Sequence, residues 1–212
     1  MTAGTLLCFG YGYSAHILAR RLHGLGWEVR GTTRSAEKLE ALRGKGVAPF
    51  ILDRGRPLPA AAFAGVTHVL TSIPPDEAGD VGLDMHGRDL AALPGLAWIG
   101  YLGTTAVYGN HDGRWVDETT PLEPTLARAD RRTKAEAAWL ESGLLVHIFR
   151  LAGIYGPGRN ALVNLKAGTA RRIVKPGQVF SRVHVEDIAN AVAASMRQPN
   201  RGRVYNVCDD EP

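Results

Sequence analysis

The stretch FGYGYSA near the N-terminus has glycines at a spacing that could bind phosphate groups. Gly10, Gly12 and Ala15 fit the pattern G-x-G-x-x-A, in which the first glycine permits a tight turn and the second lets a pyrophosphate approach the backbone. The small third residue lets a helix pack closely on a strand. The backbone N–H groups of Tyr13 and Ser14 would then face the phosphates from the positive end of that helix. A glycine turn without a ligand is the alternative.

The residues after the next apolar run indicate which dinucleotide would fit. At this place an acidic residue accepts a hydrogen bond from the ribose 2′-OH of NAD, whereas an arginine accommodates the 2′-phosphate of NADP. Thr33 stands where the acid would be, and Arg34 follows it. We therefore expect NADP, with NAD as the alternative, unless Arg34 is an ordinary exposed arginine. Asp53 could meet the adenine edge or simply close a turn, and Ser72 is expected beside the cofactor at the end of a later strand.

These residues need a sheet to position them, and the chain has the pattern of one. Short apolar runs alternate with amphipathic stretches, which is typical of parallel strands joined by crossover helices. The sequence predicts an α/β protein with a Rossmann-like doubly wound parallel sheet of about seven strands and helices on both faces. The expected strands span residues 5–10, 27–33, 48–52, 67–72, 97–103, 144–150 and 204–207.

Helical spacing and end signals predict four helices between these strands. Ala15 to Leu22 should form a helix that Gly24 closes, and Ser35 is a fitting N-cap for a helix over 36–43. Further helices are expected over 127–142 and 185–198. The proline and glycine clusters at 74–82 and 153–158 should be loops at strand ends, where such a sheet binds its ligand.

Length and composition bound the remaining possibilities. A chain of 212 residues with 45% hydrophobic residues can bury one core, so a single domain over 1–212 is expected. The net charge of +4 is modest and its basic residues are dispersed, which argues against a nucleic-acid partner. Cys8 and Cys208 have no paired spacing, so we expect no metal site and a cytoplasmic location. No apolar run approaches the roughly 20 residues of a membrane span, so no membrane partner is expected.

Several motifs in order resemble the NAD-dependent epimerase/dehydratase family, the extended and atypical short-chain dehydrogenase/reductases. They are the glycine pattern, YLGTTAVYGNHDGRWVDETTPLEP (101–124), FRLAGIYGPGRN (149–160), SRVHVEDIANAV (181–192) and VYNVCDDEP (204–212). The resemblance covers nearly the whole chain. It implies an NAD(P)-binding Rossmann fold, and an enzyme acting on a small carbonyl or nucleotide-sugar-like substrate. It also implies a homodimer that pairs through the helix over 127–139.

The resemblance implies that Thr104 hydrogen-bonds the reacting oxygen of the substrate. Thr105 is the neighbour that could be confused with it. A hydroxyl there can donate a hydrogen bond to a carbonyl oxygen or a developing alkoxide, as hydride transfer requires. The alternative is a β-branched pair that merely ends a strand. The resemblance also places Ala152 to Ile154 along the nicotinamide side of the cofactor.

The family's Tyr-x-x-x-Lys pair is only half present. Alignment puts Lys134 in the lysine position, as a ligand of the nicotinamide ribose, and Asp130 in the tyrosine position. No tyrosine of the chain has a lysine four residues later. A carboxylate beside an ammonium group has a lowered pKa and donates protons poorly near neutral pH. The alternative is a solvated ion pair, and the neighbouring Arg128, Arg131 and Arg132 allow a slipped register.

Two functions follow from this departure. An NADP(H)-dependent oxidoreductase, epimerase or dehydratase is favoured, because Thr104 has less purpose in a protein without turnover. A non-catalytic NADP(H)-binding sensor or scaffold is the alternative, because the tyrosine is absent. The substrate lobe is expected to be reduced or truncated, with about 156–180 contributing to it. An anionic substrate or merely solvent could meet the basic residues in and after this segment, namely Arg171, Arg172, Lys175 and Arg182.

Overall fold

Seven parallel strands form one sheet at the centre of the protein. The computed structural model describes residues 3–172 and 174–211. The strand order is β3-β2-β1-β4-β5-β6-β9, and all six pairings are parallel. The strands are β1 (Thr5–Phe9), β2 (Glu28–Thr33), β3 (Ala48–Ile51), β4 (His68–Thr71), β5 (Trp98–Thr104), β6 (Val146–Leu151) and β9 (Val204–Val207). The predicted doubly wound fold is confirmed, and the predicted strands differ from these by at most two residues at an end.

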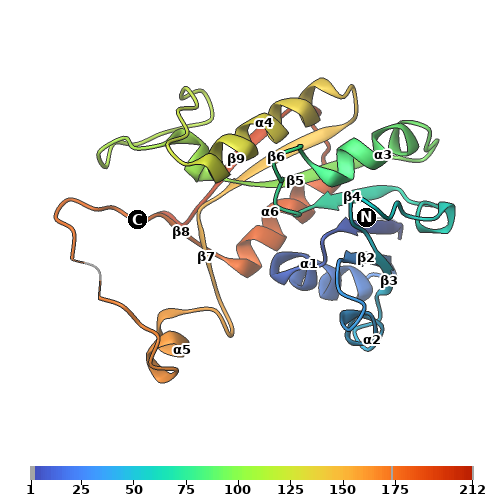
Figure 1. The fold of residues 1–212 in the computed structure, drawn as a ribbon, viewed down its shortest axis with the longest axis horizontal. Coiled ribbons are helices and arrows are strands. Elements are labelled where there is room, and N and C mark those ends of the chain that lie inside the picture. The colour runs from blue at the N-terminus through green and yellow to red at the C-terminus, as the bar shows by residue number, and fades with distance from the viewer. Residues whose placement is uncertain (1–2, 173, 212) are drawn as a thin grey trace.

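Helices cover both faces of the sheet, as Figure 1 shows. One face packs against α1 (Tyr13–His23), α2 (Lys38–Arg43) and α6 (Val185–Arg197), and the other against α3 (Val81–Ala91) and α4 (Ala127–Glu141). Two short 3-10 helices, η1 (Ala60–Ala62) and η2 (Thr105–Tyr108), complete this set. The strand order reverses between β1 and β4, so a crevice is expected at the carboxyl ends of these two strands.

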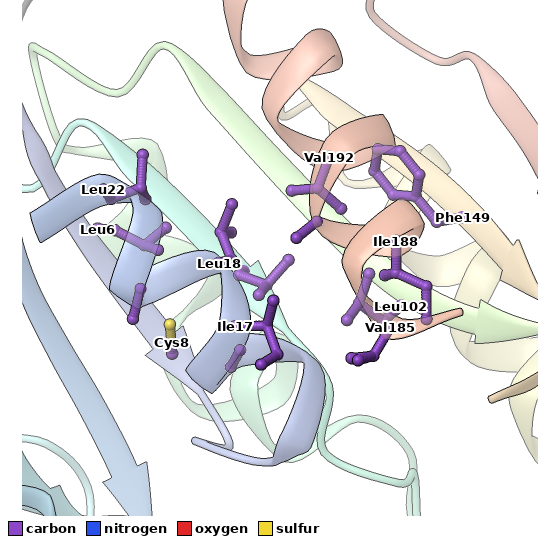
Figure 2. Close-up of a cluster of buried hydrophobic side chains, with 14 of the residues drawn as sticks. Leu6, Cys8, Ile17, Leu18, Leu22, Leu102, Phe149, Val185, Ile188 and Val192 are labelled. Atoms are coloured by element: carbon purple, nitrogen blue, oxygen red, sulfur yellow. The ribbon is translucent and has the colours of Figure 1, made fainter. Parts of the chain in front are cut away.

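The core forms two apolar layers because alternate strand residues point to opposite faces. Leu6 and Cys8 of β1 join the cluster under α1 and α6, whereas Leu7 and Phe9 join the cluster on the other face. Figure 2 shows the first cluster, in which side chains of α1 and α6 meet above the sheet. Burial on both sides explains why these strands read as nearly continuous apolar runs.

Two local predictions need correction. Ser35 does not cap a helix, because α2 begins at Lys38 after Glu37 and has no side-chain cap. The Ser35 amide instead donates to Thr33 Oγ1, and its carbonyl accepts from the Lys38 amide, which makes a turn before the helix. Helix α3 was not predicted. Its signal is Asp80, whose carboxylate caps it by accepting from the amides of Gly82 and Leu83.

A second, smaller sheet carries the segment that leaves the main body. Strand β7 (Gly153–Tyr155) pairs in parallel with β8 (Arg182–His184). Between them, α5 (Ala161–Lys166) lies apart from the main sheet (Figure 1), and every described residue from 161 to 180 is exposed. Within residues 3–172 and 174–211, no helix combines the length and apolar character needed to cross a membrane.

Candidate cofactor and substrate site

The glycine turn after β1 is fixed by its neighbours. Gly10 has φ +83°, and a side chain there would bring a Cβ to 2.9 Å from Cγ1 of Ile73. The Gly10 amide donates to Thr32 Oγ1 at 2.8 Å, and Ser72 Oγ donates to the Gly10 carbonyl at 2.8 Å. Both the left-handed backbone and the close contact therefore require glycine at this position.

The space above the start of α1 is open. Gly12 precedes the helix in an extended conformation, and no side chain caps the helix. A Cβ at Gly12 would meet no atom of the described chain within 4 Å. Ala15 is buried against the sheet, which lets α1 lie close to β1. The first-turn amides of Tyr13 and Ser14 therefore form an uncapped helix terminus with room for an anion.

Tyr13 links this helix terminus to the loop after β7. Its hydroxyl donates to the carbonyl of Pro157 at 2.9 Å, and the guanidinium of Arg159 lies 5.9 Å from the centre of its ring. A Cβ at Gly156 would lie 2.6 Å from the Tyr13 hydroxyl oxygen. The loop over 156–159 thus packs against the start of α1.

The end of β2 lies beside this turn, because β1 and β2 pair in register. Thr33 Oγ1 accepts from the Ser35 amide at 3.2 Å, and Arg34 is exposed. The Asp53 carboxylate, after β3, accepts from the Gly55 amide at 3.0 Å, and the Asp53 backbone carbonyl accepts from the Arg56 amide at 2.9 Å in a tight turn. The turn role, which the sequence left open for Asp53, is therefore present in the structure.

Thr104 faces a cavity at the carboxyl end of β5. Its Oγ1 accepts from the Ala106 amide at 3.2 Å, which leaves the hydroxyl hydrogen free to donate elsewhere. Thr105 instead directs its hydroxyl toward the Leu151 carbonyl at 3.5 Å. The cavity has a volume of about 290 Å³ and is lined by Thr104, Ala106, Pro74, Pro75, Arg128, Ala129, Arg131 and Arg132. Of the two threonines, only Thr104 lines it.

The pair Asp130 and Lys134 lies outside this lining. Lys134 Nζ lies 2.7 Å from Asp130 Oδ2, and the two side chains are 75% and 44% exposed. Arg128 and Arg132, also four residues apart, face the cavity instead. The structure thus brings Arg128 and Arg132, and not the pair favoured from sequence, to the lining beside Thr104, and the roles of Lys134 and Asp130 stay predictions.

A buried ion pair fixes this rotation of α4. The helix buries Ala129, Ala135, Glu136 and Trp139. Glu136 Oε2 accepts from Arg150 Nε at 3.0 Å, and both side chains are almost fully buried. Burial raises the pKa of Glu136, and the nearby Arg150 opposes this shift. Arg150 also donates to the Tyr108 hydroxyl at 2.8 Å. With Glu136 directed inward, positions four and eight residues earlier, Arg132 and Arg128, lie along the edge that meets the strand end.

Arg132 is anchored to β5, and the tyrosine it contacts cannot reach the cavity. Its Nη1 donates to the Tyr101 hydroxyl at 3.2 Å and to the Leu102 carbonyl at 3.0 Å. Burial raises the pKa of Tyr101 well above its usual range, although Arg132 opposes this shift. Tyr101 is 0% exposed and protonated at neutral pH, so it does not replace the absent family tyrosine.

A second cavity continues from the first. Its volume is about 590 Å³, and it shares Pro75 and Arg131 with the smaller one. Arg54, which also lines it, donates to both carboxylate oxygens of Asp76 at 2.6 and 2.7 Å and to Asp84 at 2.8 Å. The Arg54 guanidinium lowers the pKa of Asp76 to about 2.

The other predicted residues lie on the smaller sheet or in the exposed segment. Ile154 of β7 is half-buried and packs against the core under α1 and α6. Arg182 begins β8 with its guanidinium 5.4 Å from the ring of Phe180, and it lines neither cavity. Its substrate role remains a prediction, as do those of the exposed Arg171, Arg172 and Lys175. Across the described residues, no cluster of three His, Cys, Asp or Glu side chains could hold a metal ion.

Two solved structures share this fold, and the proteins that match this chain do so over nearly its whole length at 28% to 53% identity. A solved structure of a conserved protein of unknown function from Silicibacter pomeroyi is 53% identical, with a TM-score of 0.92, and the match covers 99% of this chain and 74% of the other. A putative NAD-dependent epimerase/dehydratase from Methylobacillus flagellatus is 29% identical, with a TM-score of 0.75, and covers 100% and 77%. Protein YeeZ of Escherichia coli is 28% identical over 94% of this chain and 75% of its own length. No protein-family model matches the chain.

Proposed function

Because this chain matches a putative NAD-dependent epimerase/dehydratase over its full length at 29% identity, we infer that it belongs to that family and propose that it is an NADP(H)-dependent oxidoreductase, epimerase or dehydratase. The proposed dinucleotide lies across the carboxyl ends of β1 and β4, with its pyrophosphate at the start of α1 and its nicotinamide toward Thr104. A small carbonyl compound, or its alcohol, is the proposed substrate.

The glycine turn and the open space next to it carry the proposal. Gly10 and Gly12 leave an uncapped helix terminus with unfilled space in front of it. Helix N-termini bind phosphate through amide N–H groups and the helix dipole. The switch in strand order is at the same place, where open α/β sheets bind ligands. A purely structural turn would not need Gly12, since a Cβ there would have no atom of the described residues within 4 Å.

The preference for NADP rests on the end of β2. The Thr33 hydroxyl is engaged in a local turn, and an exposed arginine follows it in place of a carboxylate. A guanidinium binds a phosphate with paired charge-assisted hydrogen bonds. Arg34 is therefore the proposed ligand of the 2′-phosphate.

The proposed chemistry uses the donors that line the smaller cavity. When bound, the nicotinamide gives or takes a hydride. Thr104 would donate its hydroxyl hydrogen to the substrate oxygen, where negative charge develops during reduction. The guanidinium groups that line the cavity would stabilise that charge as hydrogen-bond donors. Because no tyrosine is among the described residues that line the cavity, the proton for the alkoxide would come from water.

Turnover by the purified protein tests this proposal. NADPH oxidation is followed by absorbance with a panel of small aldehydes, ketones and keto acids. Thr104→Val should lower kcat/KM about a hundredfold or more, whereas Thr104→Ser should keep most of the activity. NADPH binding is measured separately by its fluorescence.

The absent tyrosine favours one second candidate, an NADP(H)-binding sensor or scaffold without turnover. It predicts tight NADPH binding that Thr104→Val leaves unchanged, and no oxidation with any compound of the panel. Pairing into a homodimer through α4 also remains a prediction, which sedimentation velocity would test.

A further inference from the structure

We propose that the cavity beside Thr104 recognises an anionic group of the substrate, a carboxylate or a phosphate, through Arg128 and Arg131. The inference rests on the proposed function, which makes this cavity the substrate site. It adds a chemical class that neither the glycine turn nor the family membership supplies: the substrate is a small acid, with its charged group beside the carbon that reacts.

Three guanidinium groups gather here, and in the part of the chain that the structure describes only Arg132 has carboxylates close enough to interact with it, namely Asp80 and Glu136. Burial raises the pKa of both carboxyl groups, and Arg132 opposes this rise. Arg128, Arg131 and Arg132 line a cavity of about 290 Å³. Among the described residues, no carboxylate forms an ion pair with any of them, because Asp130 pairs with Lys134 and Glu136 with Arg150. Like charges held together are unfavourable, and a bound anion would relieve their repulsion.

The three arginines do not have the same freedom to bind a ligand. Arg132 is committed to β5 by its hydrogen bonds to Tyr101 and Leu102. Nε of Arg131 is buried and has no hydrogen-bond partner in the described chain, and Arg128 is exposed at the start of α4. An unpaired buried donor costs free energy, which a ligand oxygen would recover. Arg128 and Arg131 are thus the two with donors available.

The neighbouring acidic residues do not compete for these arginines. Asp76 and Asp84, by the second cavity, are both bound to Arg54. Arg131 borders both cavities, and Asp76 and Glu77 line the larger one beside it, but neither carboxylate forms an ion pair with Arg131. The described lining of the smaller cavity contains no carboxylate. The smaller cavity is near the lower limit for small-molecule sites, which suits a compact acid.

The test measures anion binding to the NADPH-saturated protein, so that the cofactor blocks the phosphate site at α1. Inorganic phosphate and malonate are titrated by calorimetry at constant ionic strength, which compares a phosphate with a carboxylate source. Arg128→Ala and Arg131→Ala should each weaken binding of the preferred anion roughly tenfold or more. Arg128→Lys should bind the anion with an affinity between those of the wild type and Arg128→Ala, because lysine keeps the positive charge but cannot form the paired hydrogen bonds of a guanidinium.

Arg197→Ala is the matched control, because it removes an exposed arginine from α6 on the opposite face of the sheet. It should bind both anions as the wild type does, and thermal unfolding checks that each variant is folded. Equal anion affinity in all variants, or no binding of either anion to the wild type, would overturn the inference. Arginine-dependent anion binding in a protein that does not bind NADPH would instead contradict the proposed function and leave the arginine site standing.

Discussion

The two ends of the candidate site would recognise a ligand through different parts of the chain. At the turn between β1 and α1, the site consists of backbone amides. Gly10 permits the left-handed backbone there, and Gly12 leaves the space in front of the amides unfilled. At the junction of β5 and α4, side chains make it, through Thr104 and the arginines of α4. The first end depends on where α1 begins, whereas the second depends on how α4 is rotated. If α4 turned about its own axis by the angle of one residue, a neighbour of Arg132 would line the cavity in its place, and the helix axis would not move.

The largest expected effect comes from removing the residue that sets this rotation. Glu136→Ala leaves Arg150 buried without its partner, which should lower the free energy of unfolding by about 3–5 kcal/mol. Urea denaturation measures this loss. Glu141→Ala, at the exposed end of the same helix, should change it by no more than about 0.5 kcal/mol. A loss below about 1 kcal/mol for Glu136→Ala would mean that apolar packing alone orients α4.

The second-largest expected effect tests the turn between β1 and α1, where backbone amides form the site. Gly12→Ala adds a methyl group to open space, so stability should change by less than about 1 kcal/mol. The same methyl group would keep the pyrophosphate from the backbone, so NADPH affinity should fall at least tenfold, or about 1.4 kcal/mol. Fluorescence titration gives the affinity.

The control for this change is Gly24→Ala at the other end of α1. Gly24 has φ −61°, and its Cβ would contact the Arg21 carbonyl at an ordinary 3.4 Å. NADPH affinity should be unchanged in this variant. Equal losses of affinity in the two variants would indicate an effect on α1 as a whole and not on a phosphate site.

A change of cofactor preference is a smaller effect at the same end. Arg34→Asp removes the proposed 2′-phosphate ligand and adds an acceptor for a ribose hydroxyl. The ratio of NADPH to NADH affinity should fall roughly tenfold, since a charge-assisted pair contributes about 1.5–3 kcal/mol. Arg20→Asp, at an exposed position on α1, controls for net charge. An unchanged ratio would exclude Arg34 as the 2′-phosphate ligand.

Local patterns predicted the backbone-based end well and the side-chain end less well. The seven strands and the place of the glycine turn follow from apolar runs and from G-x-G-x-x-A, which are short-range signals. The register of α4 depends on a partner far along the chain, because Arg150 lies 14 residues beyond Glu136. A buried glutamate is unusual, and sequence alone shows no reason to point Glu136 inward and Lys134 outward. Helix α3 was not predicted because its capping residue, Asp80, lies within the segment 74–82, whose prolines and glycines indicate a loop.

The smallest expected effect decides between the two registers of α4. Lys134→Ala removes one partner of an exposed ion pair, which solvent screens, so stability should fall by only a few tenths of a kcal/mol. NADPH affinity should be unchanged, because Lys134 lines neither cavity. Asp130→Ala should match it in both measurements, since each change breaks the same pair. A tenfold loss of NADPH affinity confined to Lys134→Ala would show that this lysine holds the ribose after all, and that α4 rotates when the cofactor binds.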